Sequence, residues 1–144
     1  MDRYELPSVL QGKCTQEDYA HWLYAQAAAH LKGDAKEGDA LAALAIYEAV
    51  IHDAVCENGH VDAYTGRPLR WELIQACDDD ESKQGKREYK DLFADLPTVN
   101  REDEELGKPR FKICSWRTSD CKNDLTVGEL LRFCHEFIEY QVSI

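Results

Sequence analysis

The chain has 144 residues, of which 44% are hydrophobic and 31% are charged. This composition excludes a disordered chain and is typical of a single folded domain with a sizeable core. The formal net charge is −11, which disfavours nonspecific binding to nucleic acid because such binding needs lysine and arginine to displace counterions. The acidity fits simple solubility, or a protein partner rather than bare DNA.

No segment approaches the roughly 20 consecutive apolar residues that span a bilayer. Residues 1–14 also lack a basic start followed by an apolar stretch, so we expect no secretory signal. These two features predict a cytoplasmic protein that does not bind membranes.

Six cysteines are spread along the chain without any Cys-x-x-Cys pair, which predicts free thiols that mostly pack as small buried hydrophobic groups. They occur at positions 14, 56, 77, 114, 121 and 134. His52, Cys56 and His60 are spaced four apart and leave open a zinc-stabilised structural module. The simpler interpretation is a helix end with ordinary polar and packed residues.

The first part of the chain, residues 1–59, predicts a pair of helices. Thr15 is a good N-cap for a helix that ends near Gly33. Asp39 can cap a second helix, from about Ala40 to Cys56, which is apolar on more than one side and is therefore expected in the core. A short polar connector between the two predicts a helical hairpin.

The middle of the chain is less regular. Thr65-Gly66 indicates a turn, and the apolar alternation from Leu69 to Leu73 fits either a short strand or a short helix. The acidic run at 78–81 is typical of a solvated loop or a helix start. Residues 82–96 predict a short amphipathic helix that ends before Pro97.

The last third of the chain has the outline of a ββα unit. A strand ends at Asn100-Arg101, a charged turn follows, and a second strand runs from Phe111 to Cys114. A polar segment, Ser115 to Asp124, then leads to a final amphipathic helix that begins with the capping box Thr126-Val127-Gly128-Glu129. We therefore predict an α+β fold, with a single domain over 1–144 whose ββα part occupies 60–144.

Two motifs in this part resemble a known family. They are Tyr64-Thr65-Gly66-Arg67-Pro68-Leu69 and the segment from Cys114 to Leu125, which contains Trp116-Arg117 and ends in Lys122-Asn123-Asp124-Leu125. Together they are similar to HNH-type nucleases of the ββα-metal (His-Me finger) superfamily, and in particular to bacterial and phage HNH-related proteins. The resemblance covers about half the chain. Five residues of the two motifs are the candidate binding residues: Tyr64, Arg67, Trp116, Arg117 and Lys122.

The resemblance implies a metal-dependent cleavage mechanism, and it also implies which residues would carry it. An Asp at the end of the first strand would hold a divalent metal, the next residue, His, would act as general base, and an Asn on the helix would complete the metal site. Here those positions are Asn100, Arg101 and Ser119. An arginine stays protonated and cannot accept a proton. Because all three positions depart together, we expect no ordinary HNH cleavage.

Other residues near these positions keep an active variant open. Asp103 follows the first strand within an acidic run, and Asp120, Asn123 and Asp124 lie near Ser119. Their side chains could hold Mg²⁺ or another divalent metal, which takes few protein ligands and keeps several waters. The sequence thus favours a degenerate, non-cleaving HNH-type binding or regulatory module without a cofactor. A metal-dependent endonuclease with replaced ligands is the alternative.

Overall fold

A computed structural model describes residues 4–34, 40–75, 92–102 and 110–143 of the chain. Within these residues the fold is mixed α+β, with helices at both ends and a two-stranded antiparallel sheet, as the sequence predicted. The elements in chain order are the 3-10 helix η1 (Ser8–Leu10), α1 (Gln16–Asp34), α2 (Ala40–Asn58), the 3-10 helix η2 (Trp71–Gln75), β1 (Pro97–Glu102), β2 (Arg110–Ser115), α5 (Trp116–Lys122) and α6 (Val127–Ser143).

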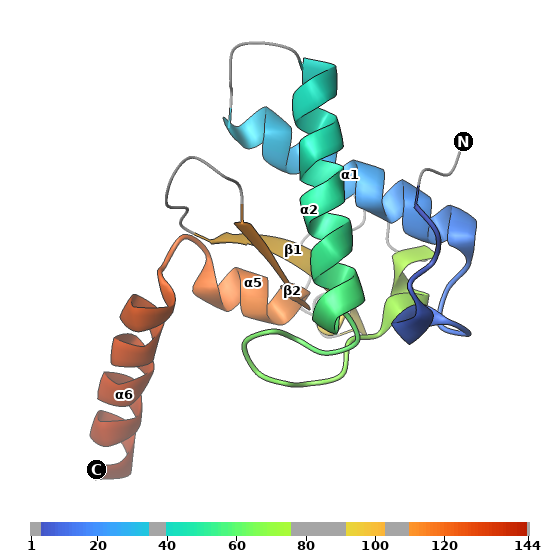
Figure 1. Ribbon diagram of the computed structural model, residues 1–144. Helices are drawn as coiled ribbons and strands as arrows, with labels where there is room; N and C mark the ends of the chain where they lie inside the picture. Colours follow the sequence, from blue (N-terminus) through green and yellow to red (C-terminus); the bar gives the residue numbers. More distant parts are fainter. Residues whose placement is uncertain (1–3, 35–39, 76–91, 103–109, 144) are drawn as a thin grey trace.

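The two predicted N-terminal helices are present and pack against each other, with α1 passing behind α2 in Figure 1. Thr15 caps α1 as expected, since its hydroxyl accepts a hydrogen bond from the backbone N–H of Asp18 at 3.1 Å. Both helices contribute fully buried side chains to one core, among them Tyr19 and Leu23 of α1 and Ile51 and Val55 of α2. The apolar surface that the two helices share therefore fixes the hairpin.

The segment that fitted either a strand or a helix is the 3-10 helix η2, preceded by an isolated bridge between Val61 and Pro68. Its first residue, Trp71, is fully buried and meets Trp22 edge-on with ring centroids 4.7 Å apart. The indole N–H of Trp71 donates to the carbonyl of Gly59 at 2.7 Å, just beyond the end of α2. Trp71 thereby joins the middle of the chain to both N-terminal helices.

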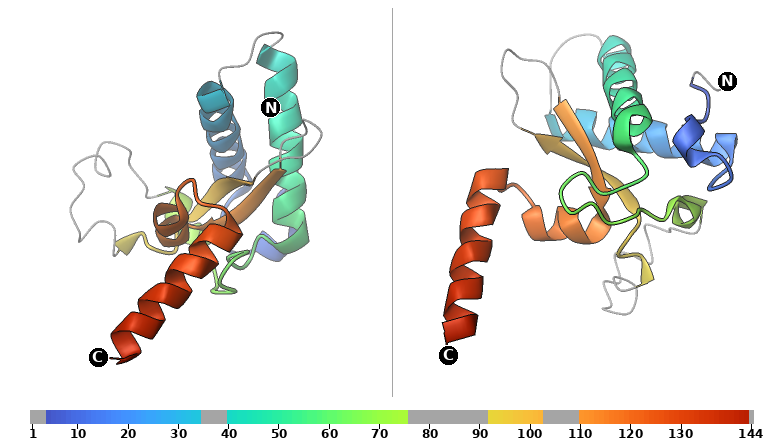
Figure 2. Two further views of the ribbon diagram at one scale, coloured as in Figure 1. Left: turned by 90° about the vertical axis from the view of Figure 1, so that its left-hand side faces the viewer. Right: turned by 60° about the horizontal axis from the view of Figure 1, so that its bottom comes forward.

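Strands β1 and β2 pair in a register that places Asn100 opposite Lys112 and Arg101 opposite Phe111. Helix α2 packs on β2, and α5 follows β2 without a loop (Figures 1 and 2). The polar segment predicted from Ser115 onward therefore contains a helix through Lys122. Its start is fixed by Ser115, whose hydroxyl accepts from the N–H of Thr118 at 3.0 Å.

The outer edge of β1 is covered by three hydrogen-bonding side chains of α1, spaced four residues apart on one helix face. The indole of Trp22 donates to the carbonyl of Pro97 at 3.0 Å. Gln26 accepts from the N–H of Val99 at 3.2 Å, and His30 bonds the Val99 carbonyl at 2.9 Å. Backbone groups that an edge strand would leave open are thus satisfied by a helix.

Helix α6 begins at the predicted capping box, in which Thr126 and Glu129 exchange hydrogen bonds of 2.9 and 3.1 Å. It extends away from the rest of the molecule in both views of Figure 2. None of its described side chains is buried. The apolar stripe that the sequence predicted is therefore exposed and does not contribute to the core.

The described cysteines are free thiols, as expected, but their predicted burial is only partly correct. Cys114 is buried and Cys14 is partly buried, whereas Cys56, Cys121 and Cys134 are exposed. The acidic run at 78–81, Cys77 and most of the helix predicted over 82–96 lie outside the described residues. Among the described helices, none has the length and apolar character that crossing a bilayer requires.

We expect Trp71→Phe to lower the free energy of unfolding by about 2 kcal/mol, because it removes a buried hydrogen bond and leaves space beside Trp22. Urea unfolding followed by circular dichroism measures this loss. The control is Tyr24→Phe, which removes an exposed hydroxyl and should change stability by less than about 0.5 kcal/mol. A Trp71→Phe variant as stable as the control would contradict the bridging role of this indole.

Candidate functional site around the two-stranded sheet

A buried carboxylate, Asp62, holds the start of α5 against the loop that precedes η2. One of its oxygens accepts from the backbone N–H groups of Tyr64 and Thr65 at 2.8 and 3.2 Å. The other accepts from the N–H of Ser115 at 2.9 Å and from the hydroxyl of Thr118 at 2.6 Å. The side chain is only 1% exposed, so these four donors replace its water shell.

The pKa of Asp62 reflects two opposing effects. Burial raises it, but the hydroxyl of Thr118 and the backbone N–H groups of Ser115, Tyr64 and Thr65 stabilise the charged form. The net effect is a pKa below the ordinary carboxyl value, so Asp62 is ionised at neutral pH. It acts as a structural anion beneath the ββα unit, because all of its contacts are internal donors.

The hydroxyl of Tyr64 connects two residues on the same face of β1. It donates to a carboxylate oxygen of Glu102 at 3.1 Å and accepts from the side-chain amide of Asn100 at 3.2 Å. Burial and the charge of Glu102 raise the pKa of the Tyr64 phenol, so it remains a donor. Asn100 is 8% exposed and is thus held in a structural hydrogen bond.

Arg101 lies on the opposite face of β1, because side chains alternate along a strand. Its guanidinium donates to the hydroxyl of Tyr47 on α2 at 3.3 Å. The same group lies 5.8 Å from the ring centroids of both Tyr47 and Phe111, which are cation–π distances. Arg101 thus joins α2 to β2 across the sheet.

Lys122, the last residue of α5, is turned inward and is only 4% exposed. Its ammonium donates to the carbonyl of Leu125 at 2.6 Å and lies 5.5 Å from the ring centroid of Tyr64. The side chain therefore closes the turn between α5 and α6 instead of extending into solvent. Asn123 within this turn adopts a positive φ of 48°, which asparagine tolerates better than most residues.

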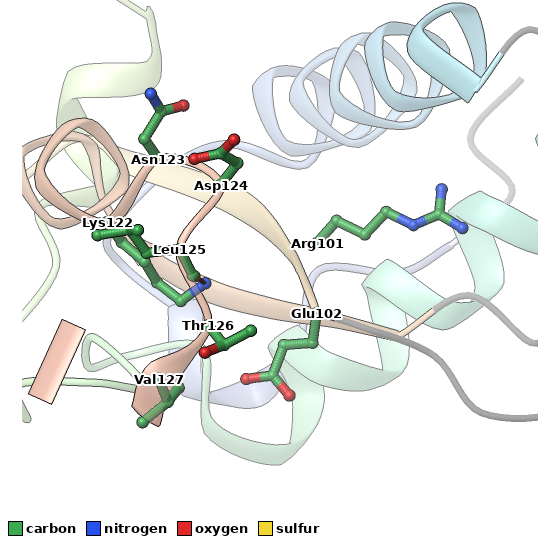
Figure 3. A pocket seen from close by; sticks show the side chains of 8 residues that line it. All are labelled: Arg101, Glu102, Lys122, Asn123, Asp124, Leu125, Thr126 and Val127. Carbon is green, nitrogen blue, oxygen red and sulfur yellow. Dashed lines mark hydrogen bonds between the residues drawn. The ribbon is translucent and has the colours of Figure 1, made fainter. Parts of the chain in front are cut away.

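A cleft of about 190 Å³ lies between the end of β1 and the turn before α6 (Figure 3). In Figure 3 the guanidinium of Arg101 points away from Lys122, while the carboxylate of Glu102 points toward the start of α6. The lining residues are Arg101, Glu102, Lys122, Asn123, Asp124, Leu125, Thr126 and Val127.

Some of the site residues predicted from the sequence line the cleft, and others lie outside it. Asn123 and Asp124 line it and are exposed. Ser119 is partly buried on α5, where its carbonyl accepts from the N–H of Asn123 at 2.8 Å, and Asp120 is exposed on the same helix. Asp103 lies outside the described residues. Among those described, no three His, Cys, Asp or Glu side chains are grouped so that they could hold a metal ion.

The other predicted binding residues are spread over the surface beside the unit. Arg67 makes an exposed ion pair with Asp95 at 2.9 Å. Trp116 is partly buried and Arg117 is exposed, and their backbone N–H groups donate to the carbonyls of Leu96 and Ala94. These bonds attach the first turn of α5 to the segment before β1.

The residues of the zinc hypothesis only partly come together. The Nε2 of His52 lies 3.4 Å from the sulfur of Cys56, and its Nδ1 lies 2.7 Å from the hydroxyl of Tyr19. Burial lowers the pKa of His52 and raises that of Cys56, and the charge of Asp53 raises both. His60 is exposed, and its carbonyl accepts from the N–H of Leu69 at 3.0 Å.

Two residues that organise the site, Asp62 and Tyr47, were not among the site residues predicted from the sequence. Asp62 had a local signal, because an Asp that precedes a Thr-Gly turn by three residues often bonds the following backbone N–H groups. Tyr47 had none, since its contact with Arg101 joins positions 54 residues apart.

Comparison with known proteins adds no relative: no protein-family model matches the chain, and neither a curated protein nor a solved structure matches it significantly.

Asp62→Asn should destabilise the protein by about 3 kcal/mol at pH 7. The amide keeps one acceptor oxygen but directs an NH₂ group at donors that need an acceptor. Chemical unfolding of the two proteins measures the difference. Asp124→Asn makes the same change at an exposed site and should stay within about 0.5 kcal/mol of the parent.

The stability difference between the parent and Asp62→Asn should also depend on pH. Because folding lowers the pKa of Asp62, its stabilisation is fully present above the ordinary value of 3.8 and is lost as the pH falls through the folded value. Unfolding at pH 7 and at pH 3 should therefore show a smaller difference at pH 3. A difference that grows toward acid pH would argue against an ionised Asp62.

Proposed function

We propose that this protein is a degenerate, non-cleaving HNH-type module that binds a protein partner. One observation carries the proposal: the residues at the expected chemical positions of β1 take part in internal contacts that maintain the fold. Asn100 bonds Tyr64, and the guanidinium of Arg101 lies between Tyr47 and Phe111.

The chemistry of these side chains supports the loss of cleavage. A general base must accept a proton near neutral pH, and the guanidinium of Arg101 cannot do so. Asn100 offers a neutral oxygen where the resemblance implies a charged metal ligand, and its amide nitrogen already donates to Tyr64. Ser119 offers only a hydroxyl at the helix position. No single replacement restores both a base and a metal site.

The surface properties support a protein partner. The net charge of −11 opposes the counterion release that drives binding to DNA. In contrast, helix α6 exposes seven large apolar side chains, each at least 43% accessible. Contiguous apolar surface of this kind marks sites of protein association.

The cleft favours one alternative function, a metal-dependent endonuclease with replaced ligands. Glu102 and Asp124 supply carboxylates to the cleft, and Asn123 lines it as well. Mg²⁺ binds through one or two carboxylates and retains several waters, so it requires few protein ligands. The same experiment distinguishes the two functions.

The purified chain should not nick supercoiled plasmid above background with Mg²⁺, Mn²⁺ or Zn²⁺. Gel electrophoresis over a time course measures the conversion to open circles. Metal-dependent nicking that is lost in Asp103→Ala or Asp124→Ala would overturn the non-cleaving assignment, because a contaminating nuclease would be unaffected by either change. Circular dichroism confirms that each variant is folded.

The proposed HNH-type scaffold is tested by restoring the three expected catalytic residues together. The variant Asn100→Asp, Arg101→His, Ser119→Asn should nick plasmid at least about 100-fold above the background rate measured with the parent, since a positioned general base alone contributes that much. Arg101→Lys is the control, because it leaves no base. A folded triple variant without metal-dependent nicking would argue against an HNH-type scaffold.

A further inference from the structure

Helix α6 has an apolar face that covers half of the helix. At 3.6 residues per turn, the apolar side chains occupy roughly 200° of the circumference. Five charged or titratable residues occupy the remaining arc, where His135 and Glu139 lie 3.5 Å apart. The exposed large side chains are Val127, Leu131, Phe133, Phe137, Ile138, Tyr140 and Val142. This face is wide enough for a partner helix to contact it along the length of α6.

The exposed area matches that of a stable protein interface. Exposed fractions on this face range from 43% at Val127 to 77% at Val142. Together the seven side chains present roughly 800 Å², about what one partner contributes to a specific interface. The largest apolar patch on a typical monomer is smaller, roughly 300–600 Å².

We propose that α6 pairs antiparallel with the α6 of a second copy of this chain. A two-fold dimer brings the same patch from both copies together, so the patch must be compatible with itself. The apolar face meets this condition, because the charged residues, among them Arg132 and Glu136, lie on the other side of the helix. Cys134 is near the middle of the apolar arc and of the helix, so the two copies of this thiol face each other at the two-fold axis.

Antiparallel pairing also keeps the two acidic chains far enough apart for the repulsion between them to be weak. Helix α6 projects from the molecule, and its 17 residues make it roughly 25 Å long. The two bodies, each part of a chain of net charge −11, then lie at opposite ends of the helix pair. That separation exceeds the Debye length of about 8 Å at physiological salt, so the repulsion is screened.

This inference rests on the proposed role as a protein-binding module and names the partner of α6. The two can fail separately, because the plasmid assay reports on cleavage whereas the experiment below reports on association.

The test is the mass of the full chain in solution, measured by light scattering after gel filtration at about 50 µM. We expect twice the monomer mass of 16.5 kDa, falling on dilution. Phe137→Glu places a charge in the apolar face and should weaken the dimer at least about 100-fold, since it alters a central aromatic residue on both copies. Arg132→Gln changes the net charge by the same amount on the opposite face and should leave the dimer intact.

A second measurement locates the contact. A short bismaleimide should cross-link the parent into a covalent dimer, and Cys134→Ser should abolish that product while the mass of the complex stays doubled. Cys56 and Cys121, the other thiols that are exposed among the described residues, serve as internal controls because they remain in the variant.

Three outcomes would overturn the proposal. The first is a parent chain that is monomeric at 50 µM, and the second is a dimer unaffected by Phe137→Glu. The third is a monomer that sediments with vesicles of phosphatidylcholine and phosphatidylglycerol, which would assign the apolar face of α6 to a lipid surface.

Discussion

The ionised carboxylate of Asp62 is the contact on which the geometry of the ββα unit depends. It is buried, and its four donors come from the turn that follows it and from the junction of β2 with α5. A buried charge is tolerated only when its hydrogen-bonding capacity is met, so the turn and the helix start must both be in place. This requirement fixes where α5 begins and, through Lys122 and Leu125, where the turn toward α6 lies.

The two faces of β1 contact different parts of the fold. On one face Asn100 and Glu102 meet Tyr64, and on the other Arg101 meets Tyr47 and Phe111. The strand is thus attached to the turn after Asp62 on one side and to α2 on the other. Polar residues at these positions contribute hydrogen bonds and a cation–π contact, which attach the sheet to its neighbours in addition to apolar packing. The proposed loss of cleavage and this structural use of the same side chains are mutually consistent.

Local signals predicted the elements well. The capping residues Thr15 and Thr126 act within four residues of themselves, and their hydrogen bonds are present as expected. The layout of hairpin, ββα unit and final helix followed from periodicity and turn residues.

Contacts between distant segments were not predictable in this way. The bond between Arg101 and Tyr47 and the inward direction of Lys122 depend on tertiary packing, which a single sequence does not encode in any local pattern. The apolar stripe of α6 was predicted correctly, but its exposure was not, because periodicity identifies a face without identifying what covers it.

The three side chains of α1 that cover the edge of β1 have a consequence for how this molecule can associate. Trp22, Gln26 and His30 occupy the backbone groups that an incoming strand would need. On the other side of the sheet, the carbonyl of Ile113 in β2 accepts from the N–H of Ala63, and the N–H of Ser115 is bound by Asp62. Strand addition, by which an exposed sheet edge can pair with another chain, is thereby obstructed at both edges. Within the described residues, the exposed apolar side chains of α6 do not depend on the edges of this sheet.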